Sequence, residues 1–390
     1  MSSFILAGGS VLAALSDGLT GRVDRILARN GLLATASRFS IKIVSIPDGQ
    51  VLYERNPDLP LNPASNIKLI TMATALKELG PGFTFKTEFY SDGLIDPQGR
   101  IHNLWIKGYG DPLLVDDELQ NIVRGLKASG LKKIDGQIFF DETYFDHYDL
   151  MTYIADIHEK RYSIFTSPLS FDFNRTKRRP ESIIKEAFQN AGIRIQGPLH
   201  HEAVPPRALL LFTHSSPPLP QILRSLGKFS NNFTAEQLVK AIAAKHFGPP
   251  GSTAKGLNVL RDYLESLGIP RREFILDNGS GLTRLSKVTA SDFIRILFDL
   301  YTSPWREEII PVLSVAGRDG TMGRKLTGPR TAGKTYAKTG TLNGVSALSG
   351  YLFDPKRTLA FSFLFNDFNI SLPQIAKTEE EILVEVLDSQ

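Results

Sequence analysis

A serine and a lysine stand three residues apart at the start of an apolar segment, NPASNIKLITMATALKELG (residues 62–80). The run of apolar residues predicts a helix over 66–79, with Asn62 as its cap and Pro63 at its first position. A spacing of three places Ser65 and Lys68 on one face of that helix. The hydroxyl then lies near the positive end of the helix, where developing negative charge is favoured.

The lysine stands among the apolar residues Ile67, Leu69 and Ile70, so its side chain is expected to be buried. Burial lowers the pKa of a lysine because the charged form loses its hydration. An uncharged amine beside a hydroxyl acts as a general base, which a serine needs to become a good nucleophile. The pattern predicts that Ser65 is a nucleophile activated by Lys68.

The spacing alone does not single out this serine. Ser-x-x-Lys occurs five times, and a surface lysine after a serine is the ordinary alternative for each. The motif at Ser65 differs from the others because its lysine falls inside an apolar helix. The five serines are Ser65, Ser129, Ser182, Ser225 and Ser252.

Ser230-Asn231-Asn232 is the only Ser-x-Asn sequence in the chain. In an extended backbone, Ser230 and Asn232 point the same way, so a hydroxyl can relay protons while an amide holds a substrate carbonyl. The alternative is a simple helix cap before a helix over 234–246. Both interpretations stay open on sequence alone.

Lys338-Thr339-Gly340-Thr341 contains the only Lys-Thr-Gly sequence and precedes an apolar run. We expect an edge strand followed by a turn, with Gly340 leaving room for a peptide to approach the backbone. Lys338 and the hydroxyls of Thr339 and Thr341 then hold a carboxylate. The alternative is a glycine turn with an exposed lysine.

The three motifs, in this order, form the signature of penicillin-binding proteins and serine β-lactamases. Beyond them, the chain resembles the D-alanyl-D-alanine carboxypeptidase/endopeptidases of the low-molecular-mass class C penicillin-binding proteins (DacB type) from about residue 20 to about 366. The matching text is PASNIKL (63–69), GYGDPL (108–113), FFDE (139–142), FSNNFTAEQL (229–238), DNGSGLTRLSKVTASDF (277–293), LSVAGRDGTM (313–322) and AKTGTLNGVSALSGY (337–351).

The resemblance implies an α/β (α+β) fold: a transpeptidase/β-lactamase-like sheet flanked by helices, a helical lobe, and an inserted smaller α/β domain. It implies that Ser65 attacks the carbonyl between two D-alanines and that Lys68 activates it. Ser230 and Lys338 form a proton path, and Asn232 orients the peptide. Backbone N–H groups of Ser65 and Thr341 form an oxyanion hole.

Strands are predicted near both ends of the chain, at 40–46 and 51–54 and again at 345–353 and 359–365. Strands from both ends are therefore available for one sheet. Helices are predicted between them over 254–267 and 289–301, and after them over 375–387. Residues 83–215 differ, mixing short strands with helices predicted over 117–128 and 181–190. We predict a catalytic domain made of residues 1–82 and 216–390, with 83–215 inserted between its two parts.

Composition restricts the functional class. A net charge of +4 is too small to argue for nucleic-acid binding, and the absence of cysteine excludes thiolate chemistry. The seven histidines show no metal-ligand spacing, and Gly108-Tyr109-Gly110 lacks the third glycine of a dinucleotide-binding loop. We expect no metal, cofactor or nucleotide, and the sequence leaves the oligomeric state open.

The apolar stretch 4–15 is either a weak or truncated export signal or an N-terminal helix. The expected substrate, rather than this stretch, points to a periplasmic or otherwise exported protein.

The leading hypothesis is a serine DD-peptidase that acts on peptidoglycan stem peptides and is acylated by β-lactams. The alternatives are a β-lactamase or esterase on the same scaffold and a non-catalytic peptidoglycan-binding module. The balance between carboxypeptidase and endopeptidase activity is not determined by the sequence.

Overall fold

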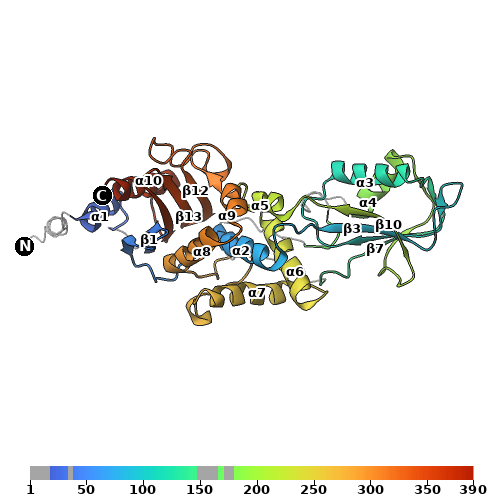
Figure 1. Ribbon diagram of the computed structural model, residues 1–390, viewed down its shortest axis with the longest axis horizontal. Helices are drawn as coiled ribbons and strands as arrows, with labels where there is room; N and C mark the ends of the chain where they lie inside the picture. The colour runs from blue at the N-terminus through green and yellow to red at the C-terminus, as the bar shows by residue number, and fades with distance from the viewer. Residues whose placement is uncertain (1–17, 34–37, 147–165, 171–179, 390) are drawn as a thin grey trace, which may run out of the picture.

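The computed structural model describes residues 18–33, 38–146, 166–170 and 180–389. The molecule is elongated, with a sheet and two covering helices at one end, a group of helices in the middle and a second sheet at the other end (Figure 1).

The first sheet has six antiparallel strands and joins the two ends of the chain, as predicted. Their spatial order is β11 (Ser314–Val315), β12 (Thr335–Leu342), β13 (Val345–Asp354), β14 (Arg357–Asn366), β1 (Arg38–Ile46) and β2 (Val51–Arg55). At its centre, β1 pairs with β14 from Arg38 opposite Asn366 to Ile46 opposite Thr358.

Both faces of this sheet are buried, because successive side chains along a strand point to opposite faces. In β1, Phe39, Ile41 and Ile43 belong to one hydrophobic core, while Val44 and Ile46 belong to another. A strand buried on both sides reads as a continuous apolar run, which explains the sequence of β13 and β14.

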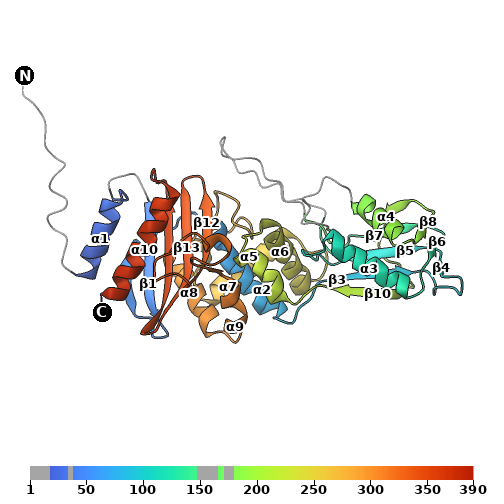
Figure 2. The same ribbon diagram turned by 90° about the horizontal axis from the view of Figure 1, so that it is seen from above.

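Helices cover both faces of this sheet (Figure 2). One face lies under α1 (Leu19–Arg29) and α10 (Leu372–Asp388), which pack side by side. The other face contacts α8 (Ala290–Thr302) and the region of α2 (Ile67–Leu79). The sheet is thus the middle layer of a three-layer arrangement.

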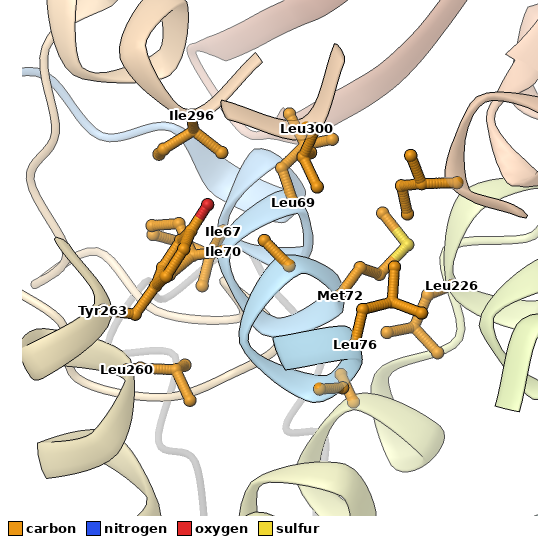
Figure 3. Close-up of a cluster of buried hydrophobic side chains, with 14 of the residues drawn as sticks. Ile67, Leu69, Ile70, Met72, Leu76, Leu226, Leu260, Tyr263, Ile296 and Leu300 are labelled. Atoms are coloured by element: carbon orange, nitrogen blue, oxygen red, sulfur yellow. The ribbon is translucent and has the colours of Figure 1, made fainter. Parts of the chain in front are cut away.

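The α2 helix lies at the centre of the helical group, whose other members are α5 (Leu219–Gly227), α6 (Asn232–Phe247), α7 (Thr253–Ser266) and α9 (Arg306–Ile309). Every residue of α2 from Ile67 to Leu76 is buried. Side chains of α2 meet Leu226, Leu260 and Tyr263 from neighbouring helices (Figure 3). A helix enclosed on all sides is apolar all round, which is the pattern found in the sequence.

The second sheet is mixed. Its spatial order is β10 (Leu209–Ser215), β3 (Lys86–Ser91), β5 (Leu104–Gly108), β7 (Ile138–Asp141) and β9 (Leu199–His201). Two helices, α3 (Asp116–Ala128) and α4 (Pro180–Asn190), contribute to a separate core with it. A small parallel sheet is made of β4 (Arg100–Ile101), β6 (Lys133–Ile134) and β8 (Arg194–Ile195).

The helices predicted over 66–79, 117–128, 181–190, 234–246, 254–267, 289–301 and 375–387 correspond to α2, α3, α4, α6, α7, α8 and α10. The sequence reasoning did not predict α1, α5 or β10. The stretch 4–15 lies outside the described residues. The division at 82/83 and 215/216 stays a prediction, although Phe85 and Ser216 exchange two hydrogen bonds where the chain enters and leaves the second sheet.

A buried pair of asparagines joins the end of β14 to the segment before α2. The side chain of Asn366 accepts a hydrogen bond from the Asn62 backbone N–H (2.9 Å) and donates one to the Asn62 carbonyl oxygen (3.0 Å). The Asn62 side chain donates to the carbonyl oxygens of Thr283 (2.8 Å) and Ser286 (3.3 Å). This pair fixes the approach to Ser65 against the sheet.

We expect Asn366→Ala to lower the free energy of unfolding by about 2 kcal/mol, because it leaves both backbone groups of Asn62 buried without partners. The chain has two tryptophans. In a Trp105→Phe background, the fluorescence of Trp305 reports urea unfolding beside the first sheet. Asn258→Ala, an exposed change on α7, is the control and should stay within about 0.5 kcal/mol. Equal unfolding midpoints for the two variants would contradict this role of Asn366.

Candidate active site

Ser65 lies in a short 3₁₀ turn, Ala64–Asn66, that leads directly into α2. The predicted first helical position for Pro63 is wrong, because Pro63 precedes this turn. The predicted helix cap at Asn62 is wrong as well, because Pro63 caps the turn and Asn66 caps α2, although the Asn62 side-chain oxygen accepts a hydrogen bond from the Ala64 N–H (2.9 Å). Ala64 has a positive φ of 44°, a conformation that costs an alanine about 1 kcal/mol.

Lys68 is fully buried and lies against the hydroxyl of Ser65. Its Nζ is 3.0 Å from Ser65 Oγ and donates to Asn232 Oδ1 (2.7 Å) and to the Ser280 carbonyl oxygen. Burial, and then the nearby Lys338 ammonium, hold the pKa of Lys68 well below its usual range. The predicted burial is confirmed.

Ser230 and Asn232 converge on the same site, although not by the predicted extended backbone. Ser230 has a left-handed φ of 56°, and Asn232 is the first residue of α6. Asn231 is the helix cap, since its side chain accepts a hydrogen bond from the Thr234 N–H. The capping interpretation is therefore correct for Asn231, while the residues on either side of it face the two lysines.

Lys338, Thr339, Gly340 and Thr341 all lie within β12. One side of β12 pairs with β13, and the other side pairs with β11 only at Tyr336 and Ala337. From Lys338 onward, that second side has no partner in β11. The predicted edge strand is correct only from Lys338 onward, because β11 lies outside the start of β12. The alternative of a glycine turn with an exposed lysine is wrong.

Gly340 serves a different contact from the one predicted. A Cβ atom at this position would lie 2.6 Å from the Pro63 carbonyl oxygen and 3.1 Å from the Ser65 nitrogen. The missing side chain lets β12 approach the turn that carries Ser65, which places the Ser65 N–H beside this strand.

Lys338 is also fully buried. Its Nζ donates to Ser230 Oγ (3.1 Å) and to the Thr339 carbonyl oxygen (2.7 Å). Burial, with a smaller contribution from the positive charge of Lys325, lowers the pKa of Lys338 from 10.5 to about 7. The Thr339 hydroxyl donates to Thr321 (2.7 Å), whereas Thr341 is exposed.

A chain of buried polar side chains ties the two lysine-bearing elements together. With its amide oriented to satisfy both neighbours, Asn66 donates to the Lys338 carbonyl oxygen (2.8 Å) and accepts from Ser349 Oγ (2.8 Å). Ser349 in turn contacts Ser362 Oγ at 2.9 Å. The structure thus brings together all the residues that the three motifs nominated.

A family model described as the D-Ala-D-Ala carboxypeptidase 3 (S13) family matches residues 19–176 and 163–389. This chain belongs to the S13 family. The resemblance stated from the motifs and the predicted fold class are confirmed.

The S13 chain is 28% identical over 433 aligned positions to a D-alanyl-D-alanine carboxypeptidase of an Actinomadura species, covering 88% of this chain and 80% of that one. Its fold matches penicillin-binding protein 4 (dacB) from Haemophilus influenzae, with a TM-score of 0.81, 21% identity and coverage of 93% and 99%. It also matches Bd3459, a predatory peptidoglycan endopeptidase from Bdellovibrio bacteriovorus, with a TM-score of 0.63, 19% identity and coverage of 90% and 94%.

Two further observations limit what the S13 chain contains. Within the described ranges, no cluster of three or more histidine, aspartate or glutamate side chains is arranged to hold a metal ion. None of the described helices is long and apolar enough to cross a membrane.

Sequence reasoning missed several residues of the S13 site. These residues form hydrogen bonds with the motif residues or with the loop that contacts them: Asn66, Glu236, Ser280, Thr321 and Ser349. Glu236 had a usable signal, because it lies four residues after Asn232 and therefore on the same face of α6. The serines and threonine had none, since their types are common on any surface.

The folded protein holds the pKa of Lys338 near 7, below its value of 10.5 when unperturbed. Between these values the unfolded chain binds more protons, so Lys338 destabilises the fold most near pH 7 and progressively less toward pH 10.5. We expect Lys338→Met to stabilise the protein, relative to wild type, by roughly 3 kcal/mol more at pH 7 than at pH 10. Urea unfolding at both pH values measures this difference.

Lys77→Met is the control for that measurement, because it removes an exposed ammonium group. A pH-independent effect of Lys338→Met, matching the behaviour of the control, would show that Lys338 is not held uncharged by burial.

Proposed function

We propose that this S13 chain is a serine DD-peptidase that cleaves the D-Ala-D-Ala bond of peptidoglycan stem peptides through an acyl-enzyme. The observation that carries the proposal is the contact between Lys68 Nζ, fully buried and with a lowered pKa, and Ser65 Oγ at 3.0 Å. An amine in that state takes the proton of the serine hydroxyl as the hydroxyl attacks.

The unpaired edge of β12 is the place for the substrate. An extended peptide can pair with this edge from Lys338 onward, as in other cases of strand addition. The C-terminal carboxylate then lies near Lys338 and the hydroxyls of Thr339 and Thr341. The scissile carbonyl oxygen points to the N–H groups of Ser65 and Thr341, which act as an oxyanion hole.

Acylation forms the bond between Ser65 Oγ and the carbonyl carbon and breaks the C–N bond to the terminal D-alanine. The serine proton passes to Lys68, while Ser230, bonded to Lys338, gives a proton to the leaving nitrogen. Lys68 has then gained one proton, and the Ser230–Lys338 pair has given one to the leaving group. Acylation therefore needs no proton from solvent. Water then cleaves the ester, which restores Ser65 and releases the shortened peptide.

Asn232 has a positioning role in this scheme. Its side-chain oxygen accepts from Lys68 (2.7 Å), which leaves its NH₂ group to hold a substrate carbonyl. Neither of the lysines, nor any other group named here, requires a metal or organic cofactor for these steps.

A β-lactam presents a strained amide to the same serine, so we infer that it acylates Ser65 and is released slowly. The substrate lies in the cell wall, so we infer that the protein works outside the cytoplasm, in the periplasm or another exported location.

We expect fluorescent penicillin to label the wild-type protein covalently and Ser65→Ala to abolish the label. Lys68→Met should reduce the rate of labelling at least about 100-fold, because the general base is lost.

Mass spectrometry of muropeptides after digestion should show loss of one D-alanine or cleavage of cross-links, and these products separate carboxypeptidase from endopeptidase activity.

Three results would contradict the proposal. A label that persists on Ser65→Ala would show a different nucleophile. Rapid turnover of β-lactams without release of D-alanine would indicate a β-lactamase. Binding to sacculi without any cleavage would indicate a binding module.

A further inference from the structure

Glu236 is a fully buried carboxyl group on α6 that none of the three motifs includes. It lies four residues after Asn232 and therefore on the same face of the helix, toward the site. A buried carboxylate is costly unless several hydrogen-bond donors and charges compensate it. The partners of Glu236 therefore show what the fold uses it for.

Those partners belong to one loop, residues 278–281. The carboxylate accepts hydrogen bonds from the backbone N–H groups of Ser280 (2.8 Å) and Gly279 (3.3 Å). The carbonyl oxygen of the same Ser280 accepts the hydrogen bond from Lys68 Nζ. A single peptide segment therefore joins Glu236 to the lysine beside Ser65.

Further contacts hold the 278–281 loop in place beside those with Glu236. Thr71 of α2 donates to the Gly279 carbonyl oxygen (2.7 Å), and Asn278 accepts from the Gly281 N–H (2.8 Å). Gly281 has a φ of 75°, and a Cβ atom there would lie 1.9 Å from the Ala64 carbonyl oxygen. The loop thus packs against the turn that carries Ser65 as well as against Lys68.

Glu236 also acts through its charge. Two charged groups act on Lys68: the Lys338 ammonium from β12, which lowers the pKa of Lys68, and the Glu236 carboxylate from α6, which raises it. Desolvation exceeds both, so the pKa of Lys68 stays low. Desolvation also raises the pKa of Glu236, against the effect of its hydrogen bonds and of Lys68.

We propose that Glu236 is a positioning residue for the reaction: it fixes the 278–281 loop, and thereby Lys68, and it holds a negative charge near the Lys68 amine. The inference rests on the proposed function for its kinetic consequence. Its structural consequence, a change in the pKa of Lys68, can be measured without any substrate.

Glu236→Gln removes the charge and leaves one loop N–H facing an NH₂ group. We expect the pKa of Lys68 to fall, because an attractive negative charge is lost. The acid limb of the pH profile for acylation by fluorescent penicillin should move to lower pH by the same amount. The maximal acylation rate should fall about 10-fold or more, because the lysine is held less firmly.

The pKa of Lys68 is read from the ε-¹³C signals of lysine-labelled protein, with the Lys68 signal identified by its absence in Lys68→Met. This titration needs no catalysis. If wild type is neither labelled by penicillin nor able to release D-alanine, the proposed function fails, and the titration still decides the role of Glu236.

Two further variants isolate the cause. Glu236→Asp keeps the charge but shortens the side chain, so the acid limb should stay at its wild-type position while the maximal rate falls. Glu379→Gln is the matched control: Glu379 is another fully buried carboxyl group, on α10, which packs against the opposite face of the first sheet from α2. It should leave both the Lys68 titration and the pH profile unchanged.

An unshifted Lys68 titration in Glu236→Gln, or equal shifts in Glu236→Gln and Glu379→Gln, would overturn the inference. If Glu236→Gln does not fold, Glu236→Asp decides alone, and a wild-type maximal rate for that variant would overturn it.

Discussion

Two lysine side chains without exposure to solvent are the constraint around which this site is built. Each ammonium group loses its hydration on burial, so the fold must supply polar atoms in its place or leave the amine uncharged. Lys68 meets the oxygens of Ser65, Asn232 and Ser280, while Lys338 meets those of Ser230 and Thr339. Because these oxygens come from four separate segments, the segments must converge before either lysine can be accommodated.

This convergence places stress on the backbone. Ala64, which precedes Ser65, and Ser230 adopt positive φ angles that L-residues rarely take. Gly281 and Gly340 lie so close to the Ser65 turn that no side chain fits at either position. Local strain of this kind persists only where the surrounding packing fixes the backbone. Here the packing comes from the two hydrophobic cores on the two faces of the first sheet.

The sequence was sufficient for the fold class and for the three motifs that the fold brings together, because both depend on patterns along the chain. Apolar periodicity located the long helices, and a lysine inside an apolar helix marked Ser65. The supporting contacts depend on what the fold brings together. Asn66 meets Lys338 and Ser349 through pairings between distant segments, and the left-handed φ of Ser230 has no signal in residue type. The same absence of signal led to the wrong expectation of an extended backbone there.

The order of strands determines when each sheet can assemble during synthesis. β1 lies between β2 and β14, and β14 ends at Asn366, close to the end of the chain. During synthesis the second sheet, from β3 to β10, can assemble from neighbouring residues, whereas the first sheet has to wait for its final strands. The Ser65 turn is held through Asn366, so this turn cannot take its final position before β14 has been synthesised.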